Sequence, residues 1–258
     1  SRGLGDVYKR QTYLFDFDYT LADSSRGIVI CFRNVLERHE HTGISDEAIK
    51  RTIGKTLEDS FSLLSGITAP ETLAEYKKEY VKEADTYMTV NTFFFPETVT
   101  VLKTLKSQGA QIGIISTKFR FRIREMVDQH FPKDFFDIII GGEDVKQAKP
   151  DPQGIKKALR RLHRQKNETL YIGDSTVDAE TAQAAKVDFV GVLNGMTTRE
   201  ELIVYPHRQI LDNLSLLPLI HKFTPYEPDK HFPEKFFYSS CFPPKIVAFY
   251  KLLHQKQI

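Results

Sequence analysis

Short apolar segments alternate with helical patterns along most of the chain, and this alternation restricts the possible folds more than any other feature. Each segment is five or six residues long, as is usual for a strand. The segments are 13–17, 111–116, 136–140, 169–173 and 188–192. Strands that alternate with helices predict an α/β fold with a parallel, doubly wound sheet. In such sheets, binding sites lie at the carboxyl ends of the strands.

Residues 24–91 interrupt this rhythm, because they show helical periodicity and no convincing strand. Side chains at helical spacing include Ile28, Phe32, Val35, Leu36 and His39, and later Leu73, Tyr76, Tyr80, Ala84 and Tyr87. We expect these tyrosines to belong to a hydrophobic core rather than to contact a ligand. The pattern predicts an inserted helical domain at 24–91, within a core domain formed by 12–23 and 92–220.

Composition limits the class of partner. The chain has 258 residues, 41% of them hydrophobic, and no apolar run long enough to cross a membrane. Its net charge of +2 resides at the two ends and leaves −3 on residues 12–220, so we expect no nucleic-acid partner. The two cysteines, Cys31 and Cys241, are too few for a disulfide framework, which favours a reducing cytoplasm.

Both ends differ from the rest of the chain. Residues 6–11 (DVYKRQ) resemble the translation of a transposon end used in sequencing libraries, so we expect residues 1–11 not to be native. Residues 221–258 are rich in aromatic residues and proline and contain no glycine. We interpret them as a C-terminal extension that is either loosely attached or packed on a partner or on the domain itself.

The strongest chemical signal follows the first strand, where the sequence reads Asp16-Phe17-Asp18-Tyr19-Thr20. In extended chain, Asp16, Asp18 and Thr20 face the same side. Crowded carboxylates repel, so one stays protonated or the pair recruits a cation. An acidic loop that caps the next helix would explain one of these aspartates but not both.

Three weaker signals lie at later strand ends and near helix starts. Ser116-Thr117-Lys118 could bind phosphate or cap a helix. Lys149, before two prolines, places a cation at a helix start, where it needs an anionic partner. Asp174 and Asp178 add two carboxylates at the same edge of the sheet, although either could be a helix cap.

Together and in this order, the four motifs resemble those of the haloacid dehalogenase superfamily of phosphohydrolases. The resemblance covers residues 12–220 and implies a Rossmann-like parallel sheet with a mobile cap. The helical insert is similar to the small cap of the subgroup that contains phosphoglycolate phosphatase and beta-phosphoglucomutase. Tyr19 departs from the family pattern, because it stands where glycine is usual, and this puts the shape of the loop in question.

The resemblance implies a role for each residue of the first motif. Asp16 would attack phosphorus to form an aspartyl phosphate. Asp18 would protonate the leaving oxygen and then deprotonate water, which requires its pKa to be raised by its neighbours. Thr20 would orient Asp18.

Metal and phosphate sites are implied in the same way. Four aspartates and a phosphate dianion against one lysine require a divalent cation and a proton. Mg²⁺ would take oxygens from Asp16, Asp174 and the main-chain carbonyl of Asp18, with Asp178 behind these ligands. The expected phosphate ligands are Ser116, Thr117 and Lys149.

Substrate selection is expected to lie in the cap. Lys55, in a loop similar to the one that approaches the active site in this subgroup, either meets an anionic substrate or is solvated. Ile28 and Leu57 stand where the mutase relies on histidine and arginine, which argues against a mutase. We expect Arg120, Arg122 and Arg124 to form a solvated face rather than to extend the anionic site.

The function predicted from the sequence is Mg²⁺-dependent hydrolysis of a small phosphomonoester similar to phosphoglycolate. The alternatives on the same fold are a pyrophosphatase, a nucleotide phosphatase and a sugar-phosphate mutase. A signalling receiver domain would place its acidic pair and its phosphorylated aspartate in a different order, and a catalytically dead binding protein would not retain every charged position. The sequence does not determine the oligomeric state.

Overall fold

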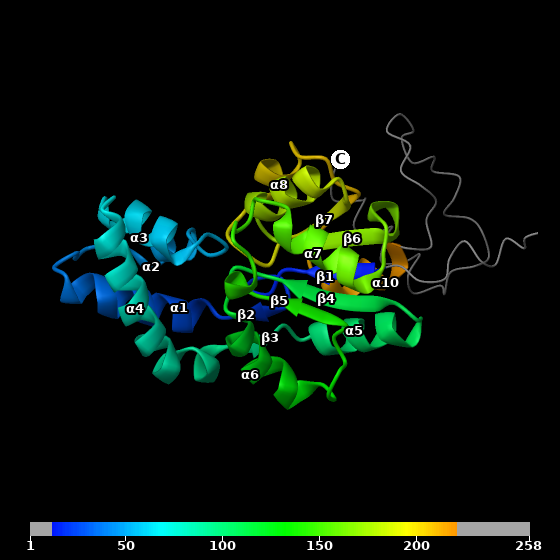
Figure 1. The fold of residues 1–258 in the computed structure, drawn as a ribbon, viewed down its shortest axis with the longest axis horizontal. Helices are drawn as coiled ribbons and strands as arrows, with labels where there is room; N and C mark the ends of the chain where they lie inside the picture. Colours follow the sequence, from blue (N-terminus) through cyan, green and yellow to red (C-terminus); the bar gives the residue numbers. More distant parts are fainter. Residues whose placement is uncertain (1–11, 221–258) are drawn as a thin grey trace, which may run out of the picture. The chain divides into compact units, whose positions relative to one another are not determined.

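A six-stranded parallel sheet forms the centre of the computed structural model, which describes residues 12–220 (Figure 1). Its spatial order is β5-β4-β1-β6-β7-β8, and every neighbouring pair is parallel. The strands are β1 (Thr12–Phe15), β4 (Gln111–Ile115), β5 (Ile138–Ile140), β6 (Thr169–Gly173), β7 (Asp188–Val192) and β8 (Gln209–Leu211). The predicted α/β fold is confirmed, although β8 was not predicted, because its two apolar residues do not form an apolar segment of strand length.

Helices cover both faces of the sheet (Figure 1). One face packs against α5 (Thr98–Ser107), α6 (Arg120–His130) and α10 (Leu217–Ile220), and the other against α7 (Gln153–Leu162), α8 (Thr176–Ala185) and α9 (Arg199–Leu202). Short 3₁₀ turns lie at Thr89–Asn91, Gly142–Asp144, Lys166–Glu168 and Leu214–Leu216. The sheet is therefore buried on both sides, as its uninterrupted apolar strands require.

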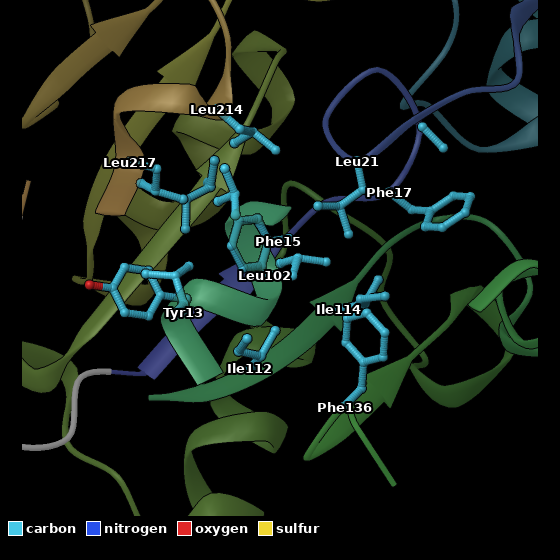
Figure 2. Close-up of a cluster of buried hydrophobic side chains, with 14 of the residues drawn as sticks. Tyr13, Phe15, Phe17, Leu21, Leu102, Ile112, Ile114, Phe136, Leu214 and Leu217 are labelled. Atoms are coloured by element: carbon cyan, nitrogen blue, oxygen red, sulfur yellow. The ribbon is translucent and has the colours of Figure 1, made fainter. Parts of the chain in front are cut away.

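Strand β1 shows how the sequence divides its side chains between the two faces. Tyr13 and Phe15 point into the cluster that also contains Ile112 and Leu102 (Figure 2). Leu14, between them, packs on the opposite face with residues of α7 and α8. This alternation follows from the two-residue period of a strand, and it leaves the next residue, Asp16, at the end of the central strand.

Residues 25–87 form four helices with a hydrophobic cluster of their own. They are α1 (Ser25–Arg38), α2 (Asp46–Lys50), α3 (Leu57–Ser65) and α4 (Pro70–Tyr87). Phe32, Phe61, Tyr76 and Tyr80 are buried together in this cluster. Residues at helical spacing thus meet as the periodicity predicts, while the exact domain boundaries stay a prediction.

A two-stranded antiparallel ribbon lies where the chain passes between the sheet and these helices. It is formed by β2 (Ala22–Asp23) and β3 (Phe93–Phe94), with Ala22 opposite Phe94 and Asp23 opposite Phe93. The outgoing and returning segments are therefore joined by backbone hydrogen bonds.

The predictions for residues 1–11 and 221–258 lie outside the described residues. Among residues 12–220, none of the helices combines the length and apolar character needed to cross a bilayer.

Truncation of Leu14 tests the central strand. Leu14 is fully buried, so Leu14→Ala should lower the free energy of unfolding by about 2–5 kcal/mol, measured by urea denaturation followed by circular dichroism. Leu63→Ala is the matched control: Leu63 is 65% exposed, so its loss should change this energy by less than about 0.5 kcal/mol. Equal losses for the two variants would contradict the placement of β1.

Candidate active site

The acidic and polar residues predicted from the sequence emerge from three neighbouring strands. Phe15 of β1 is in register with Ile114 of β4 on one side and with Ile172 of β6 on the other. Asp16 directly follows β1, and its N–H donates a 2.9 Å hydrogen bond to the carbonyl of Ile172. Because the strands are parallel, Asp16, Ser116 and Asp174 all emerge at one edge of the sheet.

Lys149 joins two of the carboxylates. Its Nζ lies 3.0 Å from Asp16 Oδ2 and 2.6 Å from Asp178 Oδ1, and all three side chains are almost fully buried. Burial alone would lower the pKa of Lys149, but the charges of Asp16 and Asp178 outweigh this effect and leave the pKa raised. Lys149 is therefore a buried cation with the anionic partners that the sequence analysis required.

Asp178 is fully occupied by protein groups. Its Oδ1 accepts hydrogen bonds from Lys149 Nζ at 2.6 Å and the Tyr171 hydroxyl at 3.0 Å, and its Oδ2 accepts from Ser175 Oγ at 2.7 Å and Ser175 N at 3.2 Å. A carboxylate with both oxygens engaged has little capacity left for a direct ligand. The hydrogen bonds of Asp178 therefore suit a residue that holds Lys149 and the start of α8 in place.

Asp16 and Asp174, unlike Asp178, can still accept a further ligand on their carboxylate oxygens. Asp16 Oδ1 is sealed from solvent and has no hydrogen-bond partner among the described residues. Carboxylate oxygens of Asp16, Asp174 and Asp178 lie within 4.8 Å of one another. Buried, under-coordinated carboxylate oxygens are the ligands that a hard divalent cation prefers, so the residues fit a metal site.

The pKa values reflect the same crowding. Burial raises the pKa of Asp16 to about 6, with further increases from Asp178 and Asp18 against the lowering effect of Lys149. The pKa of Asp174 is raised well above its usual range, first by burial and then by Asp178 and Asp16. The cluster thus has more negative charge than Lys149 neutralises, and added positive charge would stabilise its ionised form.

The loop after β1 shows two local details. Tyr19 has a φ of 58°, the left-handed conformation that glycine adopts most easily, so the loop keeps a turn typical of glycine without a glycine. The Thr20 hydroxyl donates to Asp174 Oδ1 at 3.1 Å. The expectation that Thr20 orients Asp18 is therefore wrong, because its hydroxyl is already engaged by the aspartate from β6.

Lys118 orients Asp18 instead, and sequence reasoning missed this role. Its Nζ lies 2.8 Å from Asp18 Oδ1 and 3.1 Å from Oδ2, and it also approaches the Ser24 hydroxyl at 3.4 Å. Both side chains of the ion pair are largely buried. The sequence feature that could have revealed this role is the position of Lys118 in the Ser116-Thr117-Lys118 segment, which brings a cation to the strand end beside Asp18.

A cavity of about 770 Å³ opens between this edge of the sheet and the helical insert. Asp18, Thr117, Lys118 and Lys149 contribute from the sheet side, and Lys55 contributes from the insert, where it is exposed. Ser116 is buried, and its Oγ accepts a 3.3 Å hydrogen bond from the Lys118 N–H. The Thr117 hydroxyl donates to the Gly54 carbonyl at 3.3 Å, so the loop at Gly54 contacts the sheet side directly.

Arg122 does not belong to a solvated face. It is 7% exposed and lines the cavity, whereas Arg120 is exposed. Its guanidinium pairs with Asp85 of α4 and with Glu125, the latter at 3.1 Å. The prediction was wrong for this position because the inner side of α6 faces α4.

Gly195 is a second residue that sequence reasoning missed. It lies in the loop after β7, and a Cβ at this position would collide with Asp174 Oδ2 and come within 3.1 Å of Tyr19 Cβ. Only glycine allows the backbone to pass this close to the carboxylate. The sequence feature that could have pointed to Gly195 is a glycine just beyond a strand that ends at the same edge of the sheet.

The fold and this set of strand-end residues define a class of enzyme. Residues 13–192 match the model of the haloacid dehalogenase-like hydrolase family, and the chain belongs to this family of hydrolases. A solved haloacid dehalogenase-like hydrolase from Bacteroides fragilis is 61% identical with a TM-score of 0.80, covering 81% of this chain and 100% of that one.

Two further relatives carry more specific names. The chain is 31% identical to pyrophosphatase PpaX of Bacillus mycoides, over 83% of this chain and 98% of the relative. A structure described as a phosphoglycolate phosphatase from Lactobacillus plantarum has a TM-score of 0.70 at 23% identity, over 82% of this chain and 97% of that one, and supports the fold alone.

Replacement of Asp16 tests the electrostatic strain in the cluster. A pKa raised from 3.8 to about 6 means that the folded state binds this proton more tightly than the unfolded state. The stabilisation from the proton is present below about pH 4 and is lost as the pH rises through 6, which amounts to roughly 3 kcal/mol. In EDTA, Asp16→Asn should therefore raise the free energy of unfolding by about 1–3 kcal/mol at pH 7.5 and by less at pH 5.

Urea denaturation at the two pH values measures this difference. Asp212→Asn is the control, because Asp212 forms an exposed pair with Arg199 and should change the energy by less than about 1 kcal/mol. A loss of stability in Asp16→Asn that is the same at both pH values would contradict the raised pKa.

Proposed function

We propose that the chain is a Mg²⁺-dependent phosphatase that hydrolyses a small phosphomonoester, similar to phosphoglycolate, through an aspartyl-phosphate intermediate. The observation that carries the proposal is the Asp16 carboxylate, buried at the end of the central strand, with one oxygen on Lys149 and the other without a protein partner. Such a carboxylate is positioned by the protein and has one oxygen that no described protein group occupies.

In the first step Asp16 is the nucleophile and Asp18 is the general acid. An oxygen of Asp16 attacks phosphorus, the bond from phosphorus to the leaving oxygen breaks, and Asp18 supplies the proton to that oxygen. In the second step Asp18 takes a proton from water, which attacks phosphorus and releases phosphate from Asp16. Lys118 supports both steps by holding both oxygens of Asp18 in one orientation.

Positive charge around the transferred group comes from several sources. Lys149 lies 3.0 Å from Asp16 and so stands next to the place where the phosphoryl oxygens would gather, together with Ser116 and the N–H groups near Thr117. Asp16, Asp174 and the main-chain carbonyl of Asp18 would hold Mg²⁺, which supplies charge neutralisation for the phosphoryl group when bound. Asp178 holds Lys149 in place from behind.

The closest alternative is a pyrophosphatase, favoured by the name of the Bacillus mycoides relative. A sugar-phosphate mutase is disfavoured, since Ile28 and Leu57 line the cavity with apolar side chains where the mutase relies on histidine and arginine. The remaining alternative on this fold, a nucleotide phosphatase, uses the same chemistry on a larger leaving group.

A panel of phosphorylated compounds assayed for phosphate release tests the proposal. With Mg²⁺, we expect release from phosphoglycolate and related small monoesters, and with EDTA we expect none. Asp16→Asn should reduce kcat by roughly a thousandfold or more while the protein stays folded, because the nucleophile is lost. Release from pyrophosphate alone would select the alternative, and full activity of Asp16→Asn would place the nucleophile elsewhere.

Removal of the Lys118 ammonium tests its role on Asp18. Lys118→Met should lower kcat by about 10- to 100-fold and alter the pH–rate profile, because the acid–base carboxylate loses its ion pair. Lys103→Met, which removes an exposed lysine from α5, is the matched control and should leave kcat and the profile unchanged. A change in KM alone would show that Lys118 binds substrate without positioning Asp18.

A further inference from the structure

Tyr80 lies on the wall of the cavity as well as in the core of the helical insert. It belongs to α4, is 7% exposed, and lines the cavity together with Asp18, Lys118 and Arg122. Its hydroxyl has no hydrogen-bond partner among residues 12–220. It is also absent from the sealed, unpartnered side-chain atoms in this part of the chain, which are Asp16 Oδ1 and Asn194 Nδ2. The hydroxyl therefore keeps access to the cavity.

The ring of Tyr80 is held firmly. It packs against Phe32 at a centroid distance of 4.8 Å and against Phe61 at 6.2 Å, in tilted and edge-on arrangements. These contacts use only the apolar part of the side chain, and phenylalanine would provide them equally well. A phenol hydroxyl turned into a mostly buried site without a partner has no structural benefit.

Tyr76, one turn earlier on α4, shows the opposite arrangement. It packs on Phe61 at 5.4 Å, but its hydroxyl lies 3.1 Å from His41 Nε2 and it does not line the cavity. The two tyrosines belong to the same helix and the same hydrophobic cluster, but their hydroxyls differ. The hydroxyl of Tyr76 is hydrogen-bonded within the helical insert, and that of Tyr80 is available to a ligand.

The charges near Tyr80 determine what its hydroxyl can do. Burial raises its pKa well above the usual range, with smaller increases from Cys31 and Asp18 and a lowering effect from Arg122. The hydroxyl therefore stays protonated and acts as a donor at neutral pH. Asp18 and Arg122 line the same cavity as Tyr80, so the hydroxyl shares it with the acid–base carboxylate and a buried cation.

We propose that the Tyr80 hydroxyl, with Arg122, forms a subsite in the cavity for an anionic oxygen of the leaving group. This inference rests on the proposed function, because Asp18 protonates the bridging oxygen of that same leaving group. It selects substrates whose leaving group carries a carboxylate or phosphate near the bond that breaks. An uncharged leaving group leaves the donor unpaired and is disfavoured.

The test compares kcat/KM for phosphoglycolate and pyrophosphate with that for phenyl phosphate, whose leaving group has no second anionic group. The wild-type protein should prefer an anionic leaving group. Tyr80→Phe should reduce that preference by about tenfold or more, because a hydrogen bond to a charged oxygen is lost. Its thermal midpoint should stay within about 1 °C of the wild type, since the hydroxyl makes no bond within the protein.

Tyr76→Phe is the matched control and should show the reverse: a lower thermal midpoint, because the contact with His41 is lost, and an unchanged preference. The proposal is overturned if Tyr80→Phe keeps the wild-type preference, if both variants lose it equally, or if the wild type has no preference. Failure of the wild type to release phosphate from all three compounds would instead overturn the proposed function on which the inference rests.

Discussion

The ion pairs of Lys149 are the interaction on which the rest of the site depends. A buried carboxylate is costly to ionise, and here those of Asp16, Asp174 and Asp178 lie within reach of one another. Lys149 bridges two of the three, and Asp178 is in turn fixed by Tyr171 and Ser175. The protein thus neutralises part of the charge and leaves the remainder concentrated on Asp16 and Asp174.

The fold was accessible from the sequence because strand and helix differ in period and length. Strand β8 and the ribbon β2–β3 were not predicted, since none of them lies in an apolar segment of five or six residues. Asp16 and Asp174 could be anticipated because each directly follows an apolar strand, and parallel strands end at one edge of the sheet. The hydrogen-bond partners of these aspartates could not be anticipated. Thr20 donates to Asp174 because of the loop geometry, which the spacing of residues in the sequence does not encode.

The roles of two basic residues also could not be predicted from the sequence. Lys118 and Arg122 lie four residues apart around the start of α6. The sequence places Lys118 in a segment that could bind phosphate or cap a helix, and it predicts a solvated face for Arg122. The structure shows that one pairs with Asp18 and that the other is buried against Asp85 and Glu125. What decides their roles is the packing of α6 against the helical insert, which is a tertiary property. Tyr80 was likewise correctly placed in the core, but its access to the cavity could not be read from helical spacing.

The ribbon β2–β3 has a mechanical consequence. Since the outgoing and returning segments are hydrogen-bonded to each other, the helical insert is attached to the sheet at one narrow strip rather than at two separate points. Rotation about that strip would carry distant parts of the insert through a longer arc than parts beside it. The loop at Gly54 touches Thr117, so a twist at Ala22 and Phe94 that moves the insert would make or break this contact while the ribbon stays paired.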